Sequence, residues 1–229
     1  EPCLVLMNHS SFIDLKIAST LLYPRPFNII CEADGFVGKE WLMRQIGCIP
    51  THKFVSETAL VKDMMYTVRT LKSSILLYPE ASYSFDGTSP TPLPESLGKC
   101  IKLLKVPVVM IRTYGAFQRD PLYNLLKLRN VDVSADMEYL LSPEEIASLT
   151  SDDINSLVSS RFAFDHFQWQ KENGIEVKEN FRTDGLCSVL YKCPKCGKEG
   201  VMESGGEEIW CSSCGKKWRM EEDGSLKAM

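Results

Sequence analysis

The residues best suited to chemistry lie near the start of the chain, in the segment Asn-His-Ser-Ser-Phe-Ile-Asp that ends at Asp14. A carboxylate beside an imidazole fixes the tautomer of the ring, which can then take a proton from an attacking hydroxyl. Five positions apart, His9 and Asp14 would face different sides of a continuous helix. They meet only if His9 lies in a loop and Asp14 in the first helical turn. Ser10 and Ser11 are natural N-caps that would supply this break.

The same residues allow a purely structural interpretation. Ser11-x-x-Asp14 is a capping box by itself, and His9 would then be a hydrogen-bonded loop histidine. The nucleophile motif G-x-S-x-G does not occur in the sequence, so no serine nucleophile is indicated. If the pair is catalytic, a histidine base that activates a substrate hydroxyl directly fits best.

A second group of reactive residues lies near the C-terminus, where two C-x-x-C pairs are separated by fourteen residues. Such pairs can place four thiolates around one Zn²⁺, and a closed Cys₄ site is usually structural. The alternative is that one pair is a redox dithiol or a disulfide, but such a site would not need a second C-x-x-C pair. Basic and acidic residues are interleaved around the pairs, without the positive excess that a phosphate-binding surface shows. Nucleic acid is therefore not predicted as a partner. The predicted ligands are Cys193, Cys196, Cys211 and Cys214.

The bulk composition is that of an ordinary folded protein. The chain has 229 residues, 44% of them hydrophobic and 24% charged, with a net charge of −4. The five other cysteines are scattered among apolar neighbours, which suits a reducing compartment. This cysteine pattern predicts cytoplasmic exposure. No stretch is long and apolar enough to span a bilayer, and no signal peptide is visible.

Short apolar runs alternate with helical patterns through the first half of the chain, which predicts an α/β fold with a mixed, largely parallel sheet covered by helices. A strand is also expected over residues 131–140. Predicted strands are 3–7, 27–31, 74–78 and 106–112, and predicted helices are 11–23, 41–46, 57–72 and 97–104.

Two helix starts follow, at Ser142-Pro143 and at Thr150, and the second helix is predicted to run toward Asn173-Gly174. Residues 175–186 are expected to be a connector. We therefore predict one domain over residues 1–185, with its motifs in 3–112 and a helical part in 142–174. A Cys₄ zinc ribbon is predicted over residues 186–229.

Four ordered blocks resemble the glycerolipid acyltransferase family, of the 1-acylglycerol-3-phosphate acyltransferase type. The first, N-H-x-S-x-x-D, is matched from Asn8 to Asp14. The second is similar to residues 41–53, where the family usually ends in Arg and this chain has Lys53. The third, F-P-E-G-T-R-S, is similar to residues 78–84, and the fourth to 106–110.

The resemblance implies that His9 and Asp14 are the catalytic pair. His9 would deprotonate the acceptor hydroxyl, which attacks the thioester of acyl-CoA or an acyl carrier protein. The acceptor implied first is 1-acylglycerol 3-phosphate. The residues implied to bind substrate are Ser11, Lys53, Glu80, Ala81, Ser82 and Tyr83.

Two alternatives stay open. Tyr83 stands where the family has Arg, and a phenol brings neither charge nor a bidentate fork, so the acceptor could be a different, non-phosphorylated alcohol. The chain could also be a degenerate acyltransferase-like module that binds partners through its ribbon. Because the implied product is a membrane lipid, peripheral contact with the cytosolic membrane face is expected.

Overall fold

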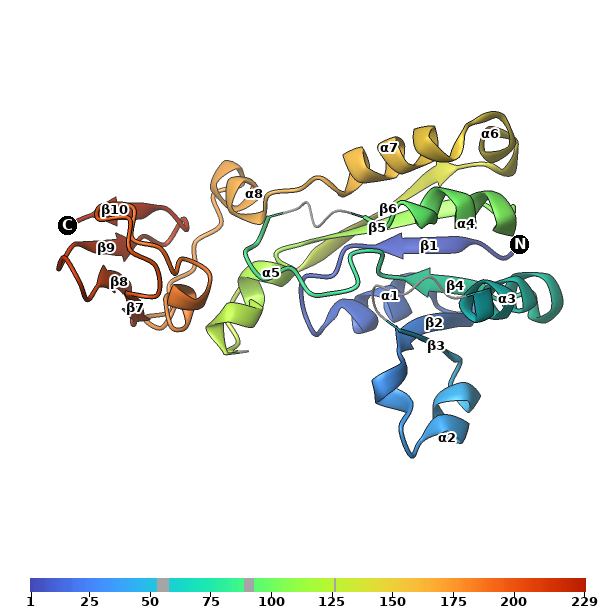
Figure 1. Ribbon diagram of the computed structural model, residues 1–229, viewed down its shortest axis with the longest axis horizontal. Helices are drawn as coiled ribbons and strands as arrows, with labels where there is room; N and C mark the ends of the chain where they lie inside the picture. Colours follow the sequence, from blue (N-terminus) through green and yellow to red (C-terminus); the bar gives the residue numbers. More distant parts are fainter. Residues whose placement is uncertain (53–57, 89–92, 126) are drawn as a thin grey trace.

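A six-stranded sheet forms the centre of the N-terminal part of the computed structural model, which describes residues 1–52, 58–88, 93–125 and 127–229 (Figure 1). The strand order is β3-β2-β4-β1-β5-β6, in which β1 to β5 are parallel and β6 is antiparallel to β5. The predicted mixed, largely parallel sheet is confirmed. The strands are β1 Leu4–Met7, β2 Phe27–Glu32, β3 Cys48–Thr51, β4 Ser74–Leu77, β5 Val108–Tyr114 and β6 Ser134–Leu141.

The central strand β1 is apolar throughout because both of its faces are covered. Leu4 and Leu6 point into the larger core, whereas Val5 and Met7 point to the opposite side of the sheet. Helices cover both faces of the sheet, and more of them lie over the larger core. The larger core is covered by α3 Thr58–Tyr66, α4 Ser96–Leu104, α6 Pro143–Ser148 and α7 Ser151–Phe162, and the opposite core by α1 Asp14–Leu22.

The helix boundaries follow local chemistry at most positions. Ser142 and Thr150 each form a reciprocal capping box, as their sequence context predicts. The helix expected over residues 57–72 is described from Thr58 to Tyr66 as α3, and from Thr67 to Leu71 it continues with π-type hydrogen bonds; its predicted first residue, 57, lies outside the described residues. Gly98 lets α4 approach α7 closely, since a Cβ there would lie 2.2 Å from the carbonyl oxygen of Ser151.

One helix prediction is wrong. The segment after Thr150 is not one helix toward Asn173 but two, α7 and α8 His166–Glu172, with a break between them. The side chain of Asp165 accepts hydrogen bonds from the amides of Phe167 and Gln168 and so starts a new helix. The backbone of Asp165 also bridges to Thr88, and the amide of His166 donates to Gly87, which ties the break to the loop after β4.

A small protruding segment joins β2 to β3. It contains the 3₁₀ turn η1 Ala33–Phe36 and the short helix α2 Glu40–Gln45, and it projects away from the sheet (Figure 1). We call residues 33–47 the α2 protrusion. Within the described part of the chain, none of the helices has the length and apolar character needed to cross a membrane.

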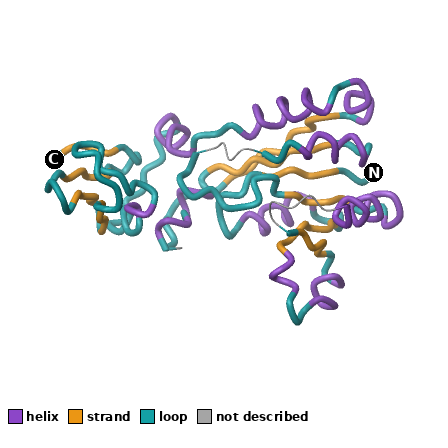
Figure 2. Tube along the Cα trace, viewed as in Figure 1, coloured by secondary structure: helices purple, strands orange, loops and turns teal. Residues whose placement is uncertain are grey.

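The C-terminal residues form a separate antiparallel sheet of four strands in the order β10-β9-β8-β7. We call residues 191–229 the C-terminal ribbon; it consists mainly of loops and short strands (Figure 2). Between the two sheets lie α5 Ala116–Arg119, η3 Leu122–Asn124, α8 and η4 Leu186–Ser188. The ribbon strands are β7 Met202–Gly205, β8 Glu208–Cys211, β9 Lys217–Met220 and β10 Leu226–Ala228.

Candidate active site

The predicted pair comes together at the carboxyl end of the central strands. His9 lies two residues after the end of β1, and its Nδ1 is 3.0 Å from Oδ2 of Asp14, the first residue of α1. The side chain of Asp14 is fully buried, whereas 17% of the His9 side chain remains exposed. His9 therefore lies in the loop and Asp14 in the first helical turn, which is the arrangement that the five-residue spacing requires.

Asp14 also orders the backbone of this loop. Its Oδ2 accepts hydrogen bonds from the amides of Ser10 at 2.8 Å and Ser11 at 3.0 Å, in addition to the imidazole. The capping box expected from the sequence is not formed, because the N-cap of α1 is Ile13, without a side-chain cap, and the amide of Asp14 donates to the carbonyl of Ser11 and not to its hydroxyl. Structural and chemical roles of Asp14 are still not alternatives, because one oxygen atom contacts both the backbone amides and the imidazole.

The contact with Asp14 assigns the tautomer of His9. A carboxylate accepts only, so Nδ1 must carry the proton that is shared with Asp14, which leaves the lone pair on Nε2. An imidazole held in this way can take a proton at Nε2 while the carboxylate stabilises the resulting imidazolium.

Two tyrosines enclose the His9 ring between their faces. The ring of Tyr83 lies 3.7 Å from it, centroid to centroid, and the ring of Tyr78 lies 4.0 Å away, with interplanar angles of 27° and 22°. Phe12 stacks in turn on Tyr83 at 4.8 Å. The stack keeps the ring plane fixed and leaves its edge as the reactive part. Tyr83 thus packs on the proposed base itself.

Glu80 is a buried residue of the site and not a solvated loop glutamate. Its carboxylate accepts the amide N–H of His9 at 2.9 Å, and the amide of Ser84 donates to the carbonyl of His9. The loop after β4 therefore holds the backbone of His9 on both sides. Burial raises the pKa of Glu80 to about 7; the hydrogen bond from His9 opposes this rise and the charge of Asp14 adds to it.

The other residues implied to bind substrate are placed unevenly. Ser11 is buried beside Asp14, whereas Ser82 is exposed and its hydroxyl makes only a long contact with the carbonyl of Glu80. Ala81 has a φ of 57°, a left-handed conformation that glycine adopts without steric cost, which explains why the related motif carries Gly there. Lys53 lies outside the described residues.

Two polar contacts of the site were not anticipated from the sequence. The side chain of Asn8 exchanges hydrogen bonds with the backbone and hydroxyl of Thr113, which joins the ends of β1 and β5. The hydroxyl of Ser11 donates a short hydrogen bond to Asp120, which lies 109 positions later in the chain. Asn8 carried a signal as part of the first block, but nothing in the local sequence marks Asp120.

The four predicted cysteines meet in the C-terminal ribbon. Their sulfur atoms all lie within 4.8 Å of one another, and two of the separations, Cys193 to Cys214 and Cys196 to Cys211, are 3.8 Å. Zinc–sulfur bonds of about 2.3 Å in a tetrahedron require sulfur separations of about 3.8 Å. The residues therefore fit a tetrahedral metal ion. Gly197 and Gly215 follow the pairs with positive φ, as predicted.

The raised pKa of Glu80 predicts a particular pH dependence of stability. Between pH 4.5 and about 7, the native protein keeps a proton that unfolded Glu80 releases, so stability falls as the pH rises. Gln cannot ionise and removes this loss. From pH 4.5 to pH 8, we expect the unfolding free energy of wild type to fall by up to ~3 kcal/mol relative to Glu80→Gln.

Urea titrations across this pH range measure the difference. Glu95→Gln, at an exposed position, is the matched control and should follow the wild-type curve. If the curves of wild type and Glu80→Gln run parallel, the proton on Glu80 does not contribute in this way.

Comparison with protein families supports the chemistry that this geometry suggests. Residues 1–113 match the family model described as Acyltransferase. This region contains His9, Asp14 and the loop from Glu80 to Tyr83, and it ends at β5. No curated protein matches the chain.

Comparison with solved structures gives a similar fold. The 1-acyl-sn-glycerophosphate (LPA) acyltransferase PlsC from Thermotoga maritima superposes with a TM-score of 0.51 at 16% sequence identity. The match covers 71% of this chain and 64% of the Thermotoga chain, which is less than two thirds of that protein's length. At this identity the likeness concerns the fold. Through residues 1–113, the chain belongs to the acyltransferase family.

Proposed function

We propose that the protein transfers a fatty acyl group from a thioester, acyl-CoA or acyl carrier protein, to the hydroxyl of a lysophospholipid. The first candidate for the acceptor is 1-acylglycerol 3-phosphate, which is the substrate class that the name of the Thermotoga enzyme gives for that protein. The observation that carries the proposal is the 3.0 Å contact between His9 and Asp14 within the region that matches the acyltransferase model.

In the proposed reaction, Nε2 of His9 takes the proton of the acceptor hydroxyl as the oxygen attacks the thioester carbonyl. The carbon–sulfur bond then breaks, and the leaving thiolate takes the proton back from the imidazolium. Asp14 holds the ring and stabilises its charged form in between. No covalent acyl-enzyme is needed in this sequence of steps.

The hydrogen bonds of the loop limit where the oxyanion can be stabilised. The amides of His9, Ser10 and Ser11 already donate to carboxylates, His9 to Glu80 and the other two to Asp14. These three N–H groups are therefore not free to bind the tetrahedral oxyanion. Its donors must come from other parts of the site or from the substrate.

Of the residues that the resemblance implies for acceptor binding, we propose Lys53 and the loop from Glu80 to Tyr83. We do not propose Ser11, because its buried hydroxyl donates to Asp120. A non-phosphorylated alcohol is the second candidate acceptor, and two observations favour it. Tyr83 stacks on His9 where a cation would bind phosphate. A small cavity beside His9 has no lysine or arginine among its described lining residues, which are Asn8, His9, Ser10, Glu80, Ser84, Thr88, Phe162, Phe164 and His166.

The enzyme proposal predicts a loss of turnover without a loss of fold. We expect His9→Ala to lower thiol release from acyl-CoA by about 10²–10⁴-fold, because the general base is removed. Asp14→Asn should also lower it, since the ring loses its orienting carboxylate. Circular dichroism and thermal melting check that both variants fold.

A panel of acceptors in the same assay separates the two acceptor classes. Stimulation by 1-acylglycerol 3-phosphate supports the first candidate, whereas stimulation by an uncharged alcohol alone supports the second. If turnover of folded protein does not depend on His9, the chain is a degenerate module that binds a partner, and the enzyme proposal is wrong.

For the four cysteines we propose a structural Zn²⁺, and we keep the domains predicted from the sequence, 1–185 and 186–229. The support is the fit of the sulfur separations to a closed Cys₄ site. The metal would supply the small ribbon with folding energy and would take no part in acyl transfer.

The zinc proposal is tested by metal content. Purified protein should carry about one equivalent of Zn²⁺, and Cys193→Ser should lower the content and the melting temperature together because a closed site loses one of four ligands. Cys187→Ser is the matched control, since Cys187 lies outside the cluster. Equal zinc content in both variants would contradict the ligand assignment.

We propose that the α2 protrusion makes the peripheral membrane contact. Its apolar side chains are unusually exposed, with Val37 75% and Trp41 73% accessible, and Leu42 and Ile46 lie beside them. Exposed basic residues, Lys39 and Arg44, flank this surface. An apolar tip with a tryptophan and adjacent cations is typical of surfaces that lie in the headgroup region of a membrane.

Vesicle co-sedimentation tests this surface. Trp41→Ser should weaken binding to anionic vesicles, because the indole is the largest apolar group that the protrusion exposes. Tyr191→Ser, an exposed aromatic residue of the ribbon, should leave binding unchanged. If the two variants bind equally well, the membrane surface lies elsewhere.

A further inference from the structure

A short segment between the two sheets is joined to residues 8–14, which we call the catalytic loop, and lies in one hydrophobic cluster with side chains of the C-terminal ribbon. This bridging segment, residues 116–124, contains α5 and η3, and it follows immediately after the region that matches the acyltransferase model. Asp120 lies at its centre, between the two helical turns. The side chain of Asp120 points toward Ser11, whereas Phe117 and Tyr123, on either side of it, lie in a hydrophobic cluster with side chains of the ribbon.

Toward the catalytic loop, Asp120 holds Ser11. The Ser11 hydroxyl donates to Oδ1 of Asp120 and accepts the amide N–H of Ile13 at 3.2 Å. Both side chains are almost completely buried. The contact therefore fixes the hydroxyl of Ser11 in one direction, away from solvent and at the turn between His9 and α1.

Ser11 in turn determines the position of Asp14. The amide of Ser11 donates to Oδ2 of Asp14, and its carbonyl accepts the amide of Asp14 at 3.1 Å. The same Oδ2 atom orients His9. Between the carboxylate of Asp120 and the imidazole there are thus only two residues, each joined to the next by a hydrogen bond shielded from water.

Toward the ribbon, the bridging segment is held by apolar packing. Phe117 and Tyr123 stand three residues before and after Asp120, and both are fully buried in one hydrophobic cluster with the ribbon. That cluster includes two of the four cysteines, Cys193 and Cys211, together with Leu186, Met202, Ile209 and Met220. The side chains that flank Asp120 therefore belong to the same hydrophobic cluster as two of the proposed metal ligands.

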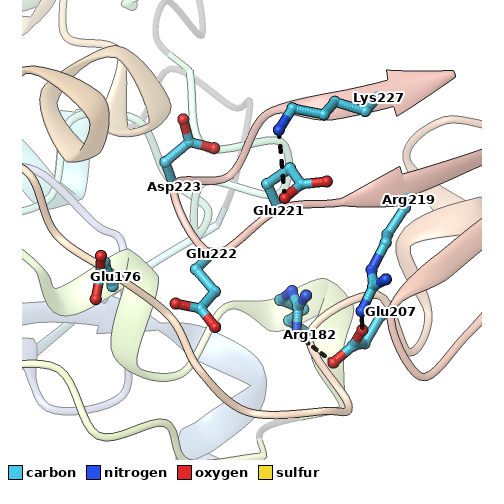
Figure 3. Close-up of a pocket in the computed structure, with 8 residues that line it drawn as sticks. All are labelled: Glu176, Arg182, Glu207, Arg219, Glu221, Glu222, Asp223 and Lys227. Atoms are coloured by element: carbon cyan, nitrogen blue, oxygen red, sulfur yellow. Dashed lines mark hydrogen bonds and ion pairs between the residues drawn. The ribbon is translucent and has the colours of Figure 1, made fainter.

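Buried polar contacts connect the same two parts. Arg129 donates to the hydroxyl of Tyr123 and to the carbonyl of Arg182, each at 2.9 Å, and its amide donates to the carbonyl of Arg119. Arg182 continues the network into the ribbon through the carbonyl of Met220 and the carboxylate of Glu207. Figure 3 shows Arg182 and Arg219 meeting Glu207 at this point.

We propose that Asp120 is a positioning residue for the His9–Asp14 pair, and that the C-terminal ribbon holds Asp120 in place through Phe117, Tyr123 and Arg129. The expected effect on kcat rests on the proposed acyl transfer. The expected effect on the order of the catalytic loop does not. The proposal gives the ribbon a role: its core anchors the segment that fixes the catalytic loop.

Kinetics of variants test the hydrogen bond. We expect Asp120→Ala to lower kcat by about 10–100-fold, since loss of the contact lets the catalytic loop move by a fraction of an ångström or more. Asp120→Asn keeps an acceptor oxygen at the same place and should retain most of the activity. A carboxylate needed for its charge alone would instead lose activity in both variants, which would overturn the proposal.

A double-mutant cycle separates the loss of this hydrogen bond from a general effect on folding. Ser11→Ala removes the donor, so Ser11→Ala combined with Asp120→Ala should be little worse than Asp120→Ala alone. Fully additive losses in the double variant would show that the two residues act separately and would contradict the proposal. If Asp120→Ala does not fold, two other variants still test the proposal. Asp120→Asn should retain most of the wild-type kcat, whereas Ser11→Ala should lower kcat.

Hydrogen exchange tests the structural part without any assay of activity. In the full chain, Asp120→Ala and Cys193→Ser should both speed amide exchange over residues 10–14, while α4 keeps its wild-type rates. Cys187→Ser is the control for the second variant. Wild-type exchange over residues 10–14 in both variants would overturn the proposal. Absence of acyl transfer in wild-type protein would contradict the proposed function and leave this measurement valid.

Discussion

A single carboxylate oxygen organises the site on which the rest of the structure depends. Oδ2 of Asp14 accepts three hydrogen bonds, from the imidazole of His9 and from the amides of Ser10 and Ser11. Each bond is charge-assisted and largely shielded from water, so each is stronger than a bond between neutral groups. Because Asp14 is also the first residue of α1, the helix dipole stabilises its negative charge. The turn of the loop, the start of the helix and the tautomer of His9 are consequences of the same interaction.

The aromatic stack around His9 distinguishes this site from one in which a cation occupies position 83. An arginine at position 83 would bring charge and a bidentate fork to an anionic acceptor. Tyr83 instead lies face to face with the imidazole and extends the stack to Phe12. In the proposed reaction, Tyr83 would therefore fix the imidazole of His9 by stacking and would not supply charge for recognition of the acceptor. Such a site gains a rigid imidazole, and it must recognise an anionic headgroup with residues outside the stack.

Local sequence signals explain most of what could be predicted. Alternation of apolar residues in β1, the capping residues Ser142 and Thr150, and the spacing of the cysteine pairs each depend on short-range chemistry, and the structure has the corresponding features. Where the prediction was wrong, a distant contact decided the outcome. The helix expected toward Asn173 breaks before Asp165 because the loop at Thr88 pairs with its backbone. The bond from Ser11 to Asp120 was out of reach for the same reason, since no periodicity links positions so far apart.

The shared hydrophobic cluster also explains how a small ribbon can matter to a distant site. Two of the proposed ligands, Cys193 and Cys211, are completely buried, and they belong to the same hydrophobic cluster as Phe117 and Tyr123 of the bridging segment. A ribbon of about forty residues has too little apolar surface for a stable core of its own. With the proposed metal bound, the ribbon would be stabilised by its four cysteine ligands and by the hydrophobic cluster that it shares with the bridging segment. In the proposed role of the ribbon, a change that loosens the cysteines also loosens this cluster, and α5 leads directly to Asp120, which holds Ser11.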